Sequence, residues 1–157
     1  MATGQHRVEV VVEDARWSDL DRIASVAVPA ALDVTCGYEV VVMGCDDARI
    51  AGLNGRFRDK PQPTNVLSWP SGPRHPDTPP SDTELGDIAI AYETCVREAA
   101  EQGKSFEAHV THLLVHATLH LLGHDHEAEA EAKRMEATER RIVMALGFPD
   151  PYADVNI

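Results

Sequence analysis

Histidine is the residue that first suggests chemistry in this chain, because six of its eight histidines fall between His109 and His126. At 100° per residue, the histidines at positions 109, 112, 116 and 120 lie within an arc of roughly 80° on one side of a helix. The neighbouring positions are apolar, which predicts a buried helix. Burying imidazoles without polar partners would cost about 1 to 3 kcal/mol each. We therefore expect the stripe to face something polar, and a metal ion fits best.

His116 and His120 are four residues apart and can present ring nitrogens to one cation. Gly123 follows at the end of the helix, where it can take a positive φ and turn the chain back. That turn would bring His126 within reach as a third ligand. Three neutral nitrogen donors and a water are typical of an open, catalytic zinc site, in which the bound water ionises near neutral pH.

Two other histidine pairs have the same spacing. His112 with His116 would also suit a metal ion, as would His120 with His124 if the helix continued. We favour His116 and His120 because only that pair leaves the turn at Gly123 free to deliver a third ligand.

The residue after the first histidine bears on the type of reaction. In HExxH metalloproteases a glutamate at that position is the general base. Ala117 occupies it here, so a peptidase mechanism of that kind lacks its base. Phosphodiester cleavage is the better expectation.

Three segments resemble the signatures of one family, the YbeY family of bacterial endoribonucleases, also called rRNA maturation factors. HATLHLLGHDH (116–126) resembles HGxLHLxGYDH, FRDKPQPTNVLSWP (57–70) resembles YRxxxxPTDVLSFP, and LGDIAI (85–90) resembles LGDIxI. The departures are Ala117 for glycine, His124 for tyrosine and Asn65 for aspartate.

The resemblance implies a zinc-dependent, single-strand-specific endoribonuclease acting in small-subunit rRNA maturation and ribosome quality control. One Zn²⁺ per chain would be held by His116, His120 and His126. The family's essential arginine falls on Arg58, whose guanidinium can hold phosphate oxygens and stabilise negative charge. Direct attack by water and attack by the ribose 2′-hydroxyl both stay open.

The partners implied are single-stranded RNA and rRNA, with ribosomal or assembly-factor proteins possible and no DNA or membrane. Trp69 could stack on a base or simply pack. Two alternatives remain: a ribosome-assembly binding factor with a structural zinc, and a metal-dependent hydrolase of another substrate.

Composition predicts one domain spanning residues 1–157, with an ordinary hydrophobic content of 43%. The formal net charge of −12 would repel RNA at long range, but residues 49–75 carry five basic side chains against one acidic one. No apolar run approaches the roughly 20 residues that cross a membrane, and the N-terminus does not have the pattern of a secretory signal. We therefore expect a cytoplasmic protein, and its three cysteines, without CxxC spacing, are expected to be buried thiols.

Hydrophobic periodicity predicts the elements that must position these residues. Strands are expected over residues 6–13, 38–43, 65–69 and 86–92, and helices over 17–31, 46–58, 94–102, 105–122 and 127–146. The third strand should lie at an edge because prolines precede it. The fold expected is an α+β (α/β-like) single domain: a four-stranded mixed sheet packed with about five helices, one of them a metalloprotease-like metal-site helix. Residues 71–82 are expected to form a mobile loop and residues 150–157 a frayed tail.

Four further polar residues near the motif are expected to play supporting roles. Asp87 is expected either to orient a histidine ligand or to cap a turn. His109 and His112 are expected to pack in the helix or to support the ligands. Asp125 is expected to be the N-cap of the last helix rather than a ligand.

Overall fold

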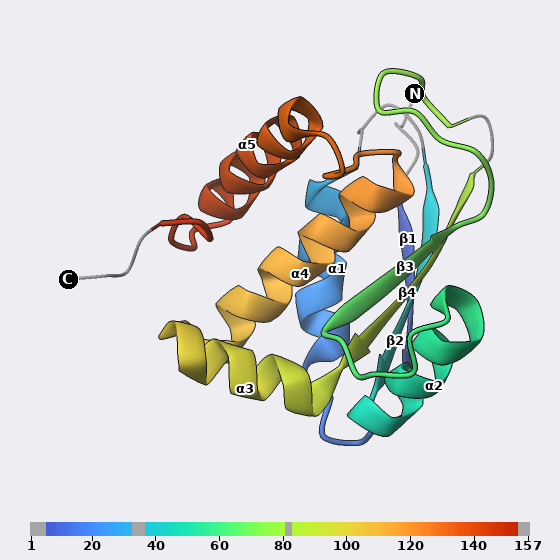
Figure 1. Ribbon diagram of the computed structural model, residues 1–157. Helices are drawn as coiled ribbons and strands as arrows, with labels where there is room; N and C mark the ends of the chain where they lie inside the picture. Colours follow the sequence, from blue (N-terminus) through green and yellow to red (C-terminus); the bar gives the residue numbers. More distant parts are fainter. Residues whose placement is uncertain (1–5, 33–36, 81–82, 154–157) are drawn as a thin grey trace.

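The centre of the molecule is a four-stranded sheet with the strand order β1-β2-β4-β3 (Figure 1). The computed structural model describes residues 6–32, 37–80 and 83–153. The strands are β1 (Arg7–Val12), β2 (Glu39–Cys45), β3 (Val66–Pro70) and β4 (Glu84–Ala91). β1, β2 and β4 are parallel, and β3 pairs antiparallel with β4. The mixed sheet predicted from the sequence is confirmed, with β3 at its edge.

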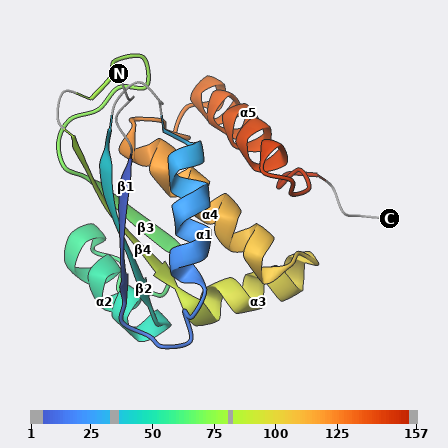
Figure 2. The same cartoon turned by 180° about the vertical axis from the view of Figure 1, so that it is seen from behind.

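Helices cover both faces of this sheet. They are α1 (Leu20–Ala30), α2 (Asp47–Arg58), α3 (Tyr92–Gln102), α4 (Phe106–Leu121) and α5 (Glu129–Ala145). In both views α2 lies against one face of the sheet, whereas α1 and α4 lie against the other and α5 packs outside α4 (Figures 1 and 2). The single α+β domain is therefore confirmed. None of the helices in the described ranges has the length and apolar character needed to cross a membrane.

The hydrophobic core is divided by the sheet. On the α1 and α4 side it includes Leu20, Ile88 and Leu114, all essentially without solvent exposure. A smaller cluster on the α2 side includes Ile50 and Leu67. The second half of β4 is buried on both faces because helices cover it from both sides. This explains why its sequence, IAIA, shows no polar alternation.

Two helix starts agree with the sequence and three do not. Asp46 caps α2 by accepting a hydrogen bond from Arg49 N (2.8 Å), and Ser105 caps α4 through Ala108 N (3.0 Å). The first helix, expected to start at residue 17, begins later, at Leu20 after Asp19. α3 begins at Tyr92, because β4 runs directly into it. α5 begins at Glu129 after Ala128, so Asp125 does not cap it.

The segment after α5 is packed rather than frayed over residues 150–153. Lys104 Nζ donates to the backbone carbonyl of Pro151 (2.8 Å), and the Tyr152 hydroxyl donates to Glu139 (2.6 Å). The expectation of a frayed tail is wrong for this part, and residues 154–157 lie outside the described ranges. Residues 71–80 form the expected loop, apart from one isolated bridge between His75 and Thr78. Cys45 and Cys95 are buried free thiols, and Cys36 lies outside the described ranges.

Candidate metal centre

Two of the three candidate ligands stand on α4, the most buried helix. Its side chains pack against β3, α1, α3 and α5, so nearly every face is covered. His116 and His120 are half-buried and face the one side of α4 that opens toward β3. Because the rest of the helix is locked by packing, the positions of these two rings are fixed by the fold.

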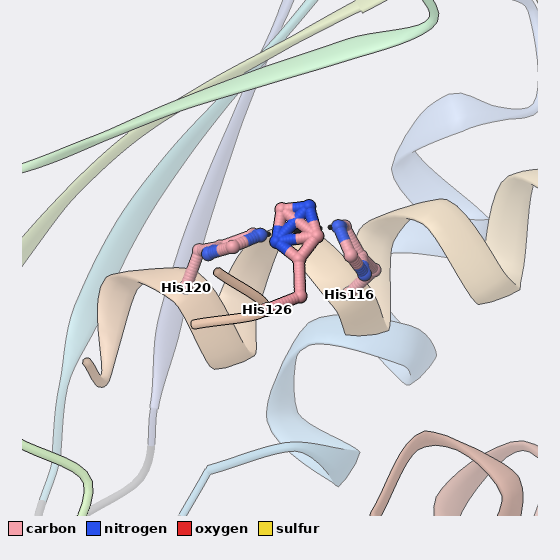
Figure 3. A group of neighbouring side chains, drawn as sticks. All are labelled: His116, His120 and His126. Atoms are coloured by element: carbon pink, nitrogen blue, oxygen red, sulfur yellow. Dashed lines mark hydrogen bonds between the residues drawn. The ribbon is translucent and has the colours of Figure 1, made fainter. Parts of the chain in front are cut away.

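The third candidate ligand, His126, is positioned by the turn that follows α4. Gly123 has φ +104°, and a Cβ at this position would lie 2.7 Å from the backbone nitrogen of His75. Only glycine meets both conditions without strain. Asp125 then accepts a hydrogen bond from the backbone nitrogen of His126 (2.6 Å), so it shapes the turn instead of capping α5. As a result, the ring of His126 points toward those of His116 and His120 (Figure 3).

The geometry of the three rings suits one metal ion. One ligand atom from each residue lies within 4.8 Å of the other two. The Nε2 atoms of His116 and His120 are 3.1 Å apart, close to the roughly 3.3 Å expected between two nitrogens bound to a tetrahedral zinc ion. The group holds no carboxylate or thiolate among the described residues. Three converging nitrogen donors, with no fourth protein ligand among the described residues, form a group that could hold a metal ion.

The alternative histidine pairs do not form such a group. His112 Nε2 is engaged by Glu139 at 2.6 Å, and its ring centroid lies 6.3 Å from that of His116. His124 lines the cleft beside the site but does not join the three converging rings. Of the pairs with suitable spacing, the structure brings a third histidine only to His116 and His120.

The electrostatics of the site favour a neutral imidazole at His120. Burial, followed by the proximity of His116 and His126, lowers the pKa of His120 to about 4. The backbone of His124 is also a hydrogen-bond partner of the His120 ring and opposes this shift in part. His120 is therefore an unprotonated donor at neutral pH, the form that a metal ion requires.

Glu139 on α5 is the functional candidate that sequence reasoning missed. It has 0% exposure, and its carboxylate accepts hydrogen bonds from His112 Nε2 (2.6 Å), His116 Nδ1 (2.8 Å) and the Tyr152 hydroxyl (2.6 Å). Burial alone would raise the pKa of Glu139, but these three donors outweigh it and lower the pKa to about 2. The sequence did hold a signal, because Glu139 occupies the same stripe of α5 as the buried Met135, Ile142 and Val143.

The walls of the site form a cleft of about 620 Å³ between α4, β3 and the end of α2. Arg58 and Lys60 line it together with the three histidines. Both are exposed, and within the described part of the chain neither side chain makes a hydrogen bond or an ion pair. Arg74 lines the cleft too, but its guanidinium donates to the Leu121 carbonyl (3.1 Å) at the end of α4. Two uncommitted cations therefore face the same space as the candidate ligands.

Two residues considered from the sequence lie elsewhere. Asp87 is exposed on the α2 side of the sheet and makes no hydrogen bond to a histidine among the described residues, so its suggested role in orienting a ligand is wrong. Trp69 is its register partner and lines the same hollow. There Trp69 packs edge-on against Phe57, with ring centroids 5.7 Å apart, and does not line the histidine cleft.

His109 and His112 are buried supports, as expected. His109 Nε2 contacts Glu98 (2.9 Å), and the same Glu98 oxygen accepts a hydrogen bond from the Asn65 side chain (3.0 Å). The asparagine at position 65 thus serves as a donor between β3 and α3, a role that an ionised aspartate could not fill.

Comparison with known proteins places these observations in one family. The family model described as endoribonuclease YbeY matches residues 5–147. A relative named endoribonuclease YbeY from Cereibacter sphaeroides is 58% identical over 163 residues, covering 92% of this chain and 98% of its own. The protein of the same name from Paracoccus denitrificans is 54% identical over 159 residues, covering 94% and 90%. A solution structure from Thermotoga maritima has the same fold, with a TM-score of 0.60 at 23% identity over 94% of this chain and 99% of that one.

Proposed function

Because this chain belongs to the YbeY endoribonuclease family, we propose that it is a zinc-dependent endoribonuclease acting on single-stranded RNA. The observation that carries the proposal is that three converging histidines and an uncommitted arginine line a single open cleft. The domain that performs the reaction would span residues 1–157.

His116, His120 and His126 would hold the ion through ring nitrogens. Zinc bound there would supply a Lewis acid and an activated water. The fold contributes the rest: α4 fixes two rings, and the turn at Gly123 fixes the third. The open side of the group faces the cleft, so a phosphodiester can approach it from solvent.

Arg58 would bind the scissile phosphate. A guanidinium can contact two phosphate oxygens at once and stabilise the charge that develops on them. Because no described side chain pairs with Arg58, it gives up no protein contact on binding substrate. Lys60 adds a second positive charge for the neighbouring phosphate. Together they offset the overall negative charge of the protein where RNA must bind.

The cellular role that fits this activity is maturation and quality control of small-subunit rRNA in the cytoplasm, with rRNA and ribosomal or assembly-factor proteins as partners. Support comes from the family and from the match of the three sequence signatures. A bacterium lacking its own family member would test this role. The wild-type chain should restore correct small-subunit rRNA ends there, and Arg58→Ala should not.

The direct test uses purified protein loaded with one equivalent of zinc and an unstructured, end-labelled RNA. We expect cleavage by the wild type and a loss of about 100- to 1000-fold in rate for Arg58→Ala, with zinc content unchanged. Arg56→Ala is the matched control, because Arg56 is exposed on the same helix but does not line the cleft. Mass spectrometry of the product ends distinguishes attack by water from attack by the 2′-hydroxyl, since only the latter forms a cyclic phosphate.

Normal cleavage by Arg58→Ala would contradict the role given to this residue. RNA binding without cleavage, combined with unfolding on chelation, would instead support a ribosome-assembly factor with a structural zinc. Hydrolysis of peptides or small phosphoesters in preference to RNA would support a hydrolase of another substrate. The exposed position of His126 argues against a closed structural site.

A further inference from the structure

Building on the metal site proposed above, we propose that Glu139 is a positioning residue that holds His116 in the tautomer and orientation needed for metal binding, and that Tyr152 holds Glu139 in place. Neither residue belongs to the sequence motif: Glu139 lies on α5, and Tyr152 lies in the segment that follows it. The proposal assigns this C-terminal part of the chain to the metal centre.

The contact between Glu139 and His116 determines which nitrogen of the ring is free. An ionised carboxylate can only accept hydrogen bonds. His116 Nδ1, 2.8 Å from Glu139 Oε2, must therefore carry the proton. That leaves the lone pair of Nε2, which faces His120 Nε2 at 3.1 Å inside the converging group. A histidine ligand whose other nitrogen donates to a carboxylate is fixed in orientation and is a stronger donor to the metal.

The carboxylate itself is held from three directions. Oε1 accepts from His112 Nε2 and from the Tyr152 hydroxyl, both at 2.6 Å, and Oε2 accepts from His116. An ionised group with 0% exposure needs such partners, because burying a charge without them is costly. Both oxygens are used, so Glu139 cannot turn without breaking a contact.

Tyr152 anchors this arrangement from the C-terminal side. Its ring packs edge-on against His112, with centroids 5.1 Å apart, and the Arg140 guanidinium lies over the Tyr152 ring, 5.3 Å from its centroid. The segment that carries it is fixed by Lys104, which donates to the Pro151 carbonyl. A contact chain therefore runs from the end of the molecule through Tyr152 and Glu139 to His116.

The test measures zinc affinity and ring tautomer separately in Glu139→Gln, Tyr152→Phe and the wild type. Zinc dissociation constants come from competition with a chromophoric chelator. We expect an affinity about 10- to 100-fold weaker for Glu139→Gln and a smaller loss for Tyr152→Phe. Nitrogen NMR of metal-free, ¹⁵N-histidine-labelled protein should show His116 protonated at Nδ1 in the wild type and a shift toward Nε2 protonation in Glu139→Gln. Glu131→Gln is the control, with the same chemical change at an exposed position of α5.

The two readouts separate this inference from the proposed function. If the wild type binds no zinc, the metal centre is wrong and the inference falls with it. If the wild type binds zinc and both variants keep its affinity and the His116 nitrogen pattern, the inference alone is overturned. Tyr152→Phe keeps the aromatic ring and leaves the buried carboxylate of Glu139 in the protein. Its zinc affinity therefore tests the inference even if Glu139→Gln does not fold.

Discussion

Among single residues, Gly123 controls the geometry of the candidate metal site although it offers no ligand atom. Its φ of +104° and the 2.7 Å approach of the His75 backbone leave no room for a side chain. We expect Gly123→Ala to displace the turn that carries His126, to lower stability by more than the roughly 1 to 3 kcal/mol of backbone strain alone, and to weaken zinc binding. Thermal unfolding and chelator competition measure the two effects.

Gly147 provides the matched control for that substitution. It also has a positive φ, +96°, but a Cβ there would meet nothing within 4 Å. Gly147→Ala should therefore show the strain alone and leave zinc affinity unchanged. Wild-type zinc affinity in Gly123→Ala would refute the idea that this turn delivers the third histidine.

The sequence could predict the three converging histidines but not Glu139. The spacing of His116, His120 and Gly123 lies within one helix and the turn after it, so local geometry was sufficient to predict the convergence. Glu139 reaches His116 across the packing of α5 on α4, and no local spacing encodes which faces of two helices meet. Its one signal was a charged residue in an otherwise apolar stripe.

Among the secondary-structure elements, the pairing of α3 with α4 contains an ionisable pair, a buried histidine and a half-buried glutamate. His109 on α4 contacts Glu98 on α3. Burial lowers the pKa of His109, and the contact with Glu98 only partly opposes this. The unfolded chain therefore takes up a proton near pH 6.5, the usual pKa of histidine, whereas the folded chain resists it. The contribution of neutral His109 to the free energy of unfolding is therefore fully present above pH 6.5 and is lost as the pH falls.

We accordingly expect the free energy of unfolding of the wild type to decrease between pH 7.5 and pH 5.5. His109→Gln keeps a donor for Glu98 but cannot titrate, so its unfolding free energy should decrease less over the same range. Urea denaturation at several pH values measures the difference. His75→Gln, at an exposed position, is the control. Parallel curves for the wild type and His109→Gln would disprove the assignment.

The helices and strands could be predicted where the sequence holds a clear local signal, such as a capping residue or a proline. Their ends were harder to predict. Capping residues at Asp46 and Ser105 marked two helix starts, and prolines near residue 65 marked β3 as an edge strand. The start of α3 was placed too late because β4 passes into it without a turn signal. The tail was expected to fray because the hydrogen bond of Tyr152 to a buried carboxylate depends on tertiary structure.

In the molecule as a whole, charge is distributed unevenly around a net value of −12. The hollow on the α2 side of the sheet, about 330 Å³, is lined by four acidic side chains, Glu9, Glu39, Glu84 and Asp87. The histidine cleft instead carries three basic side chains, Arg58, Lys60 and Arg74, against two acidic ones, Asp125 and Glu127. Among the described residues, Arg58 and Lys60 have no side-chain partner. Such a distribution repels a polyanion from one face of the sheet and favours its approach to the cleft. The amino-acid composition could not predict this distribution, because the order of the strands decides which charged residues share a face.

This polarity predicts how RNA binding depends on salt. Each phosphate contact of a single strand contributes about −0.7 to the slope of log K against log salt concentration, so Arg58 and Lys60 together should contribute a slope of about −1.4. Removing one contact by Lys60→Ala should reduce the slope by about 0.7 and weaken binding at low salt. Fluorescence anisotropy with a labelled single strand and metal-free protein measures binding without cleavage. Lys133→Ala is the control, since Lys133 lies on α5, is paired with Glu129 and does not line the cleft. If Lys60→Ala kept the wild-type slope, Lys60 would not contact phosphate, and the RNA path would have to cross another surface.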